Sequence, residues 1–279
     1  MNIYKVLPDL KKKRQIHIWN TALRSQWSAM DIDWDKPHRI TSRRFKDQMA
    51  RILTPVLMGE QAALYSVSGL IPILGHRAEV ESQFYLTTWA VDEARHTELF
   101  TYYYHRLDRE PMSIRRFPAG YLFQSQIVSK DPAEWLAGVL VSEVLAKLVL
   151  EDFKRLDLDP VLSDIADGIL LDEARHLGFN HIYLEDRFSQ LFLAEEREGE
   201  SYSGQLTERL QKVLDHVSPI LEALDEELKE VGMDRHELFH NLGTEAKRRL
   251  QRSIKAGRAV ATRQEKASRL EDAEIVGSR

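Results

Sequence analysis

The pentapeptide Asp-Glu-Ala-Arg-His occurs twice in this sequence, at residues 92–96 and again at residues 172–176. Each copy contains Glu-x-x-His, and residues three apart on a helix lie on one face. Each copy therefore places a carboxylate beside an imidazole, and two such pairs could hold two metal ions between them. This arrangement predicts redox chemistry with O2.

A dinuclear site between four helices needs one further carboxylate from each of the two remaining helices. Glu60 is the only glutamate of the first predicted bundle helix, and Glu143 lies in the middle of the third. Both have apolar neighbours in the sequence, where an unpaired carboxylate would be costly and a bound metal ion would remove that cost. Glu60 and Glu143 are therefore predicted to complete the site.

The spacing of the four glutamates fits antiparallel helices. Glu60 precedes Glu93 by 33 residues, and Glu143 precedes Glu173 by 30. At about 1.5 Å per residue, two helices joined by a short turn bring both members of each pair to one level. Four carboxylates and two imidazoles can hold two ions about 3.5–4 Å apart, and this donor set suits iron or manganese. The predicted metal ligands are Glu60, Glu93, His96, Glu143, Glu173 and His176.

The aspartates and arginines of the two motifs form a predicted outer layer of the site. Asp92 and Asp172 each precede the histidine of their motif by four residues. An imidazole bound to a metal usually donates its other N–H to a carboxylate, which fixes the ring. Each aspartate could serve its own histidine or that of the opposite helix. Arg95 and Arg175 could pair with these aspartates or form ordinary ion pairs elsewhere.

The elements that must position these residues read as helices throughout. Only 13 glycines and 9 prolines are present, and apolar residues recur at three- and four-residue spacing, so the fold class is all-α. Pro72 and Gly75 predict a turn, and the prolines and glycine within 111–120 predict a break between helices. The segment 195–204 is predicted to be an exposed loop. The predicted helices cover residues 41–70, 77–107, 131–156 and 161–188, with two or three more within 205–256.

The chain divides on this basis into four predicted parts. They are an N-terminal helical segment at 1–40 that packs on the bundle, a di-metal four-helix bundle at 41–190, C-terminal helices at 203–256 and a flexible polar tail at 257–279.

Composition narrows the classes of protein. The absence of cysteine excludes disulfides, thiolate metal sites and iron–sulfur clusters. A formal charge of -5 gives no reason to expect nucleic acid or an anionic membrane as a partner. No signal peptide is visible and no run reaches the roughly 20 apolar residues of a membrane span. The sequence therefore predicts a cytoplasmic protein.

A second metal motif competes with the first. His236 and His240 form the His-Glu-x-x-His pattern of zinc proteases, and Gly243 extends it toward the metzincin form. That form needs a third histidine where this chain has Ala246, and zinc catalysis needs three protein ligands. The protease interpretation is therefore disfavoured.

With the six predicted ligands and the doubled motif, the chain resembles the ferritin-like di-iron carboxylate proteins of the ribonucleotide-reductase-like superfamily. This group includes multicomponent monooxygenases, arylamine N-oxygenases, acyl-carrier-protein desaturases and ligand-binding oxidases. The resemblance covers about residues 41–190. It implies a ferritin-like four-helix bundle with additional N- and C-terminal helices, a cofactor of two iron ions or of manganese and iron, and O2 as co-substrate.

Several positions differ from the patterns of these groups and so narrow the possible activities. The radical tyrosine of ribonucleotide reductase small subunits would stand at Phe100. The tyrosine–valine crosslink of the ligand-binding oxidases would need other residues at Ala62 and Gly138. The extra histidine ligand of the arylamine N-oxygenases would be expected at Ile169. Lys147, one turn after Glu143, stands where the monooxygenases place a threonine; it is a tentative catalytic residue or a lysine whose amine reaches solvent.

The expected function is an O2-dependent oxidase or oxygenase that acts on a small organic substrate with electrons from an external donor, and the resemblance favours a homodimer. The alternative is a radical-bearing or metal-handling protein, similar to the ribonucleotide reductase small subunit, that acts through a partner. Side chains one turn from the ligands are expected to line the substrate pocket, namely Leu57, Ala63, Leu64, Trp89, Phe100, Leu140, Lys147 and Phe179.

Overall fold

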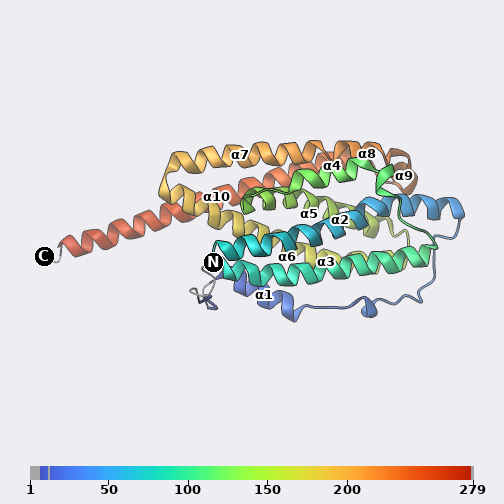
Figure 1. Cartoon of the computed structure of the whole chain (residues 1–279), viewed down its shortest axis with the longest axis horizontal. Coiled ribbons are helices and arrows are strands. Elements are labelled where there is room, and N and C mark those ends of the chain that lie inside the picture. The colour runs from blue at the N-terminus through green and yellow to red at the C-terminus, as the bar shows by residue number, and fades with distance from the viewer. Residues whose placement is uncertain (1–6, 12, 278–279) are drawn as a thin grey trace.

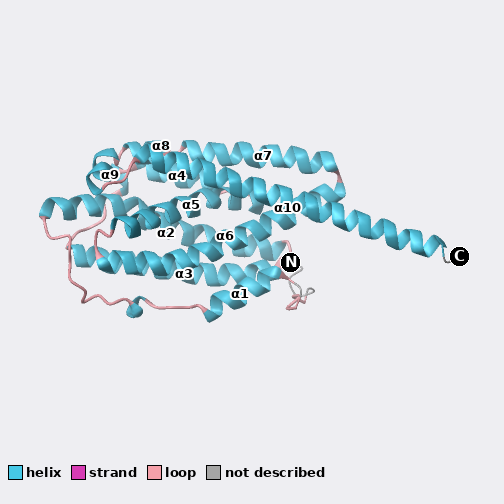
Figure 2. Cartoon of the chain, turned by 180° about the vertical axis from the view of Figure 1, so that it is seen from behind, coloured by secondary structure: helices cyan, strands magenta, loops and turns pink. Residues whose placement is uncertain are grey.

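Four long helices form the centre of the molecule. The computed structural model describes residues 7–11 and 13–277, and within this part every long element is a helix (Figure 2). Helices α2 and α3 form one antiparallel hairpin and α5 and α6 form the second. The prediction of an all-α, ferritin-like four-helix bundle is confirmed. The bundle helices are α2 (Arg43–His76), α3 (Val80–Leu107), α5 (Pro132–Leu156) and α6 (Pro160–Ala194).

Local chemistry fixes where three of these helices begin. Ser42 Oγ accepts a hydrogen bond from the backbone N–H of Phe45 at the start of α2. Asp131 caps α5 and Asp159 caps α6, each followed by a proline at the first helical position. A proline there loses no hydrogen bond, because the first N–H groups of a helix have no intrahelical acceptor. The local sequence therefore sets the starting points of three of the four helices that carry the predicted ligands.

The remaining elements surround the bundle. Helix α1 packs on α3 and α6, α7 and α10 pack along α5 and α6, and α4, α8 and α9 gather at one end of the molecule (Figure 1). The C-terminal part of α10 extends beyond the bundle as a single helix (Figure 1). These elements are α1 (Arg14–Arg24), η2 (Ala29–Asp31), η3 (Ile114–Arg116), α4 (Pro118–Ile127), α7 (Glu196–Asp215), α8 (Ser218–Glu222), α9 (Asp225–Val231) and α10 (Arg235–Gly277).

The predicted turn at Pro72 and Gly75 is wrong, because α2 continues to His76. Pro72 removes one backbone hydrogen bond, yet the neighbouring side chains of Leu70 and Leu74 are fully buried and hold this turn in place. The amide of Gln83 donates to the carbonyl of Ile71 and so satisfies one acceptor near the end of the helix. Tertiary packing therefore extends the helix past its breaker.

Two predicted irregular segments are also helical. Within 111–120, Pro118 starts α4 rather than ending an element. The polar stretch 195–204 belongs almost entirely to α7, whose later turns bury Leu206 and Leu210 against the bundle. Helix α10 likewise continues to Gly277, through the polar segment predicted as a tail. In α7, local polarity predicted a loop where buried neighbours decide the outcome. The end of α10 is helical although residues 262–270 are exposed.

Helix α2 is the one described helix that is long and apolar enough, by length and composition alone, to cross a membrane. In this fold it packs against α3 and α5 and buries Glu60, as a bundle helix does. The division of the chain at residues 40, 190 and 257 stays a prediction.

Candidate metal centre

The six predicted ligands lie together inside the bundle. They form two overlapping groups, and within each group one ligand atom from every residue lies within 4.8 Å of the others. All six side chains are buried. The first group is Glu60, Glu93, His96 and Glu173, and the second is Glu93, Glu143, Glu173 and His176.

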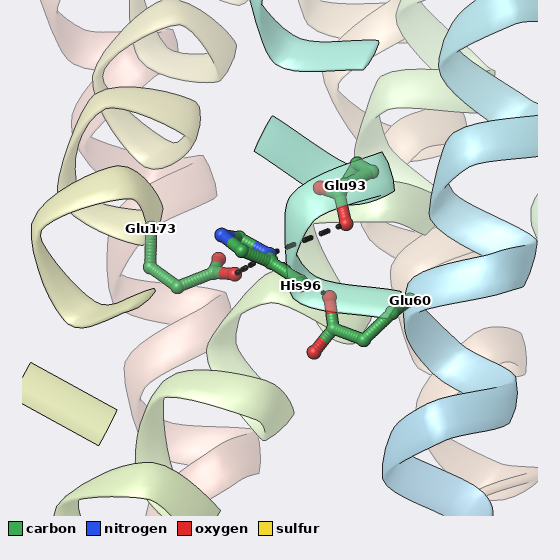
Figure 3. A group of neighbouring side chains, drawn as sticks. All are labelled: Glu60, Glu93, His96 and Glu173. Atoms are coloured by element: carbon green, nitrogen blue, oxygen red, sulfur yellow. Dashed lines mark hydrogen bonds and ion pairs between the residues drawn. The ribbon is translucent and has the colours of Figure 1, made fainter. Parts of the chain in front are cut away.

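Both histidines turn Nδ1 toward the carboxylates. His96 Nδ1 lies 3.1 Å from Glu60 Oε2, and Figure 3 shows this ring between carboxylates from three helices. His176 Nδ1 lies 3.1 Å from Glu143 Oε2 in the second hairpin. Each hairpin therefore contributes one such pair, in which the glutamate of its first helix lies against the histidine of its second helix. Glu93 and Glu173 belong to both groups and are placed to be shared between two ions.

The donor set fits two divalent cations. Glu93 Oε2 and Glu173 Oε2 are buried without a hydrogen-bond partner among the described residues. Burial raises the pKa of Glu93 to about 8, with the charges of Glu143 and Glu60 adding to the effect. Burial and the charge of Glu143 likewise raise the pKa of Glu173 well above its ordinary value. Cations would pair these oxygens and remove the repulsion, and carboxylate with imidazole suits iron or manganese.

The aspartate of each motif holds the histidine of the other motif. His96 Nε2 lies 3.1 Å from Asp172 Oδ2, and His176 Nε2 lies 3.4 Å from Asp92 Oδ2. A carboxylate accepts, so each imidazole donates from Nε2 and keeps Nδ1 free for a metal. The alternative that the sequence left open is thus decided in favour of pairing across the helices.

The two arginines close this outer layer. Arg95 Nη2 donates to Asp92 Oδ1 at 2.5 Å and to Asp172 Oδ2 at 2.6 Å. Arg175 Nη2 lies 3.1 Å from Asp92 Oδ2 and also pairs with Asp172. Two arginines and two aspartates form one buried, charge-balanced network between α3 and α6. Burial alone would raise the pKa of Asp172. The hydrogen bonds and charges of His96 and Arg95 outweigh it and lower this pKa well below its ordinary value.

Two tryptophans contact the centre, and one of them was outside the predicted site. Trp27 Nε1 donates to Asp172 Oδ2 at 2.9 Å from the segment after α1. Nothing local in the sequence indicates this contact, because 145 residues separate the partners. Trp89 Nε1 donates to Glu93 Oε1 at 2.6 Å, and its ring stacks on His176 with centroids 4.5 Å apart. Its position four residues before Glu93 on α3 could have indicated that bond.

A cavity of about 300 Å³ opens on one side of the centre. Three of the six predicted ligands line it, namely Glu60, Glu143 and Glu173. The walls come from α2, α4, α5, α8, α9 and α10, and α6 contributes Glu173 alone. The side of the centre near the histidines and α3 is therefore closed, while the α2–α5 side is open. An incoming molecule would therefore meet carboxylates rather than imidazoles.

The predicted pocket lining is mostly wrong. Of the eight residues expected there, Ala63 alone lines this cavity. Trp89, Phe100 and Phe179 are fully buried on α3 and α6, away from the open side. Lys147 is directed into an ion pair with Glu151, with Nζ 2.7 Å from Oε1. The cavity depends on α4, α8 and α9, which the sequence pattern did not place.

The competing zinc motif lies at the start of α10, with His236 and His240 both exposed. Neither belongs to a group of metal-ligating side chains within the described part of the chain. At Gly138 an added Cβ would lie 2.9 Å from the carbonyl oxygen of Ile127, so the backbone there leaves no room for a larger side chain. Ile169 is fully buried and offers no ligand atom.

The fold and the centre define the class: a ferritin-like helical protein with a buried carboxylate–histidine cluster suited to two metal ions. The family model of the p-aminobenzoate N-oxygenase AurF matches residues 72–255, and the chain belongs to this family. A search of curated protein sequences gives no match.

Solved structures agree with this fold. An R2-like ligand-binding oxidase with an aerobically reconstituted metal cofactor after photoconversion superposes with a TM-score of 0.69 at 16% identity, over 90% of this chain and 97% of that one. A mutant of an R2-like ligand-binding oxidase with an anaerobically reconstituted Mn/Fe cofactor superposes with a TM-score of 0.66 at 18% identity, over 90% of this chain and 97% of that one. Another mutant, with an aerobically reconstituted Fe/Fe cofactor, superposes with a TM-score of 0.68 at 16% identity, over 90% of this chain and 97% of that one. At these identities the likeness shows the fold, while family membership confirms the predicted class, an oxygen-using oxidoreductase.

Proposed function

We propose that this protein is an O2-activating di-metal oxygenase or oxidase that acts on a small organic substrate. The observation that carries this proposal is the convergence of four glutamates and two histidines at one buried point, beside a cavity that reaches three of the glutamates. The similar oxidases hold Mn/Fe or Fe/Fe cofactors, which supports the same choice of metals here.

The residues divide naturally between two ions. Glu60 and His96 would hold one ion, Glu143 and His176 the other, and Glu93 and Glu173 would be shared. When bound, the ions supply the electrons and the Lewis acidity that O2 activation requires. Asp172 and Asp92 keep a proton on Nε2 of the histidines, so that Nδ1 stays available as a donor atom.

The protein also controls access to the centre. The arginine–aspartate network and Trp89 seal the side near α3 and α6, and the apolar walls of the cavity exclude bulk water on the other side. A substrate would approach from the α2–α5 side, next to Glu60 and Glu143. The family match does not transfer N-oxygenation as the specific outcome, since Ile169 stands where an extra histidine ligand is expected.

Metal content and O2 reactivity test this function together. Protein loaded anaerobically with Fe(II) is expected to bind about two ions per chain and to develop optical bands of an oxidised di-iron site on exposure to O2. Replacing Glu143 with alanine should reduce the bound metal and abolish the bands. His240→Ala, in the exposed zinc motif, is the control and should leave both unchanged. A wild-type protein that binds no iron, or that binds it without oxidation, would refute the proposal.

The proposal also covers partners and place of action. We infer a cytoplasmic homodimer that draws electrons from an external donor, as expected from the sequence. The radical-bearing alternative has less support, because the buried Phe100 provides no hydroxyl one turn after His96. Light scattering on the purified protein tests the dimer, and an EPR radical signal after O2 exposure would favour the alternative.

A further inference from the structure

The cavity beside the metal centre has one charged end and one hydrocarbon end. Among its lining residues, all within the described part of the chain, Glu60, Glu143 and Glu173 carry the only charges and no side chain is basic. The end away from these carboxylates is built from α8, α9 and the start of α10. Its residues include Leu221, Leu224, Leu228 and Leu238.

The cavity is also long. On α2 its lining begins at Ile52 and ends at Ala63. Ile52 precedes Glu60 by eight residues, which corresponds to about 12 Å along a helix. A molecule whose reacting group lies at the carboxylates would therefore extend about two helical turns into leucine and isoleucine side chains.

The polar groups of the walls do not change this character. Gln124 Nε2 is already engaged, donating to Ser66 Oγ at 3.1 Å and to the carbonyl of Ala62 at 3.3 Å. Tyr121 is 63% exposed and belongs to the solvent side of the cavity. Ser142 is adjacent to Glu143, and the exposed Gln61 is adjacent to Glu60, so both belong to the charged end. An anionic group at the leucine end would thus have no partner, and an unpaired buried charge is strongly disfavoured.

The substrate in the family's name does not fit this polarity. In p-aminobenzoate the amine and the carboxylate lie at opposite ends of the ring. With the amine at the metal centre, the carboxylate would lie further along the cavity, whose lining residues include no cation. We propose that this family member takes a substrate with a single polar group at the metal-facing end and a hydrocarbon tail toward α8 and α9. This inference rests on the proposed function, because it assumes that the substrate reacts at this centre.

Binding measurements separate the two possibilities. 4-Butylaniline and 4-aminobenzoate share the ring and the amine and differ only in the group at the far end. Calorimetry on the iron-loaded protein, without O2, should show at least tenfold tighter binding of 4-butylaniline, since each buried methylene contributes severalfold to affinity. Equal or tighter binding of 4-aminobenzoate would overturn the inference. Neither result depends on turnover, so the inference can fail while O2 reactivity stays intact.

A variant of the wall places the binding in this cavity. An added Cβ at Gly59 has no atom within 4 Å, so the side chain of Gly59→Leu starts in open space on the cavity wall. Binding of 4-butylaniline should weaken at least tenfold. Gly204→Leu is the matched control, because Gly204 is exposed on α7, outside the cavity, and also has open space around its Cβ. Unchanged binding in Gly59→Leu, or equal loss in both variants, would contradict the assignment.

Leu228→Arg tests the polarity itself. A guanidinium at the leucine end would supply the missing partner of a carboxylate, so the preference between the two ligands should shift at least tenfold toward 4-aminobenzoate. Leu228 is buried, and the circular dichroism spectrum shows whether this variant folds. If it does not, the comparison of the two ligands on the wild-type protein decides the polarity, and Gly59→Leu shows that they bind in this cavity. A folded Leu228→Arg protein with the wild-type preference would refute the proposed polarity.

Discussion

Each copy of the repeated pentapeptide serves both halves of the centre. Its glutamate and histidine belong to the buried carboxylate–histidine cluster, and its aspartate lies against the histidine of the other copy. Neither copy is complete alone, because Asp92 acts on His176 and Asp172 acts on His96. The doubled motif is therefore a reciprocal unit, and the loss of one aspartate should affect the opposite hairpin.

Asp172→Asn should weaken both the centre and the fold. The amide cannot balance the charges of Arg95 and Arg175, and breaking a buried ion network of this kind costs about 3–5 kcal/mol. Loss of the carboxylate behind His96 should reduce metal affinity about 10- to 100-fold. Urea denaturation and metal titration measure the two effects. Asp157→Asn, at an exposed pair with Arg39, is the control and should change stability by less than about 1 kcal/mol.

The metal-free protein should become less stable as pH rises. The pKa of Glu93 is raised to about 8, so between about pH 4.5 and 8 the folded state holds a proton that the unfolded state has lost. Stability therefore falls with rising pH across this window. The raised pKa values of Glu173, His96 and His176 act in the same direction. Thermal melts of chelator-treated protein should show a lower Tm at pH 9 than at pH 6, and bound iron should remove most of the difference. A flat profile without metal would contradict this account.

Residue types and spacing were enough to predict that these six side chains lie together, because helical periodicity relates Glu93 to His96 directly. Their role as metal ligands stays a prediction. The same reasoning could not find Trp27, whose contact with Asp172 depends on how the segment after α1 lies across the bundle. It also misplaced the cavity, since Trp89 and Phe179 lie one turn from ligands but on the closed side. Short-range geometry predicts which side chains share a face. It does not predict which face later helices leave open.

At the scale of elements, buried contacts override local composition. The stretch 195–204 is rich in polar residues, yet Gly199 fits closely against Phe192 and Tyr202 donates to Asp131 at 2.7 Å. Both contacts link α7 to the bundle and neither can be read from the local pattern. Helix caps depend on local sequence instead, because the capping residues Asp131 and Asp159 are each adjacent to the proline that begins the helix.

The crossing of α10 over α6 should depend on Gly257. An added Cβ at this position would lie 2.8 Å from the carbonyl oxygen of Glu185 and 2.9 Å from the backbone nitrogen of Ser189. Backbone atoms cannot rotate away, so Gly257→Ala should destabilise the protein by about 1–3 kcal/mol. Gly243→Ala lies on the same helix with no atom within 4 Å and should instead stabilise it by up to about 1 kcal/mol. Chemical denaturation of both variants gives the comparison, and a neutral Gly257→Ala would show that the helices can separate.

At the scale of the whole molecule, the added helices give the bundle two unlike sides. Two hairpins of similar design meet at the centre, which alone would produce a nearly symmetric site. Helix α1 and the segment after it close one side through Trp27 and Gln26, which bonds to Asp92. On the other side α4, α8 and α9 contribute walls to a cavity that reaches three of the carboxylates. The helices outside the bundle therefore determine which side of the centre is open.

The projecting end of α10 should be dispensable for stability and for metal binding. Ala261 is buried and Arg258 packs over the ring of Phe192, whereas residues 262–270 are all exposed. A chain that stops after residue 264 keeps every buried residue of α10 among those whose burial the structure describes. Its Tm should therefore change by less than about 2 °C, and its iron content should stay the same. A chain that stops after Arg249 is the control: it loses Leu250, Ile254 and Gly257 from the contact with α6 and should melt far lower or fail to fold. A strong drop in Tm on deletion of residues 265–279 would contradict this prediction. The projecting helix would then have to pack against a partner in solution, such as a second copy of the chain. Light scattering on the full-length and the shortened protein would show whether a dimer is lost.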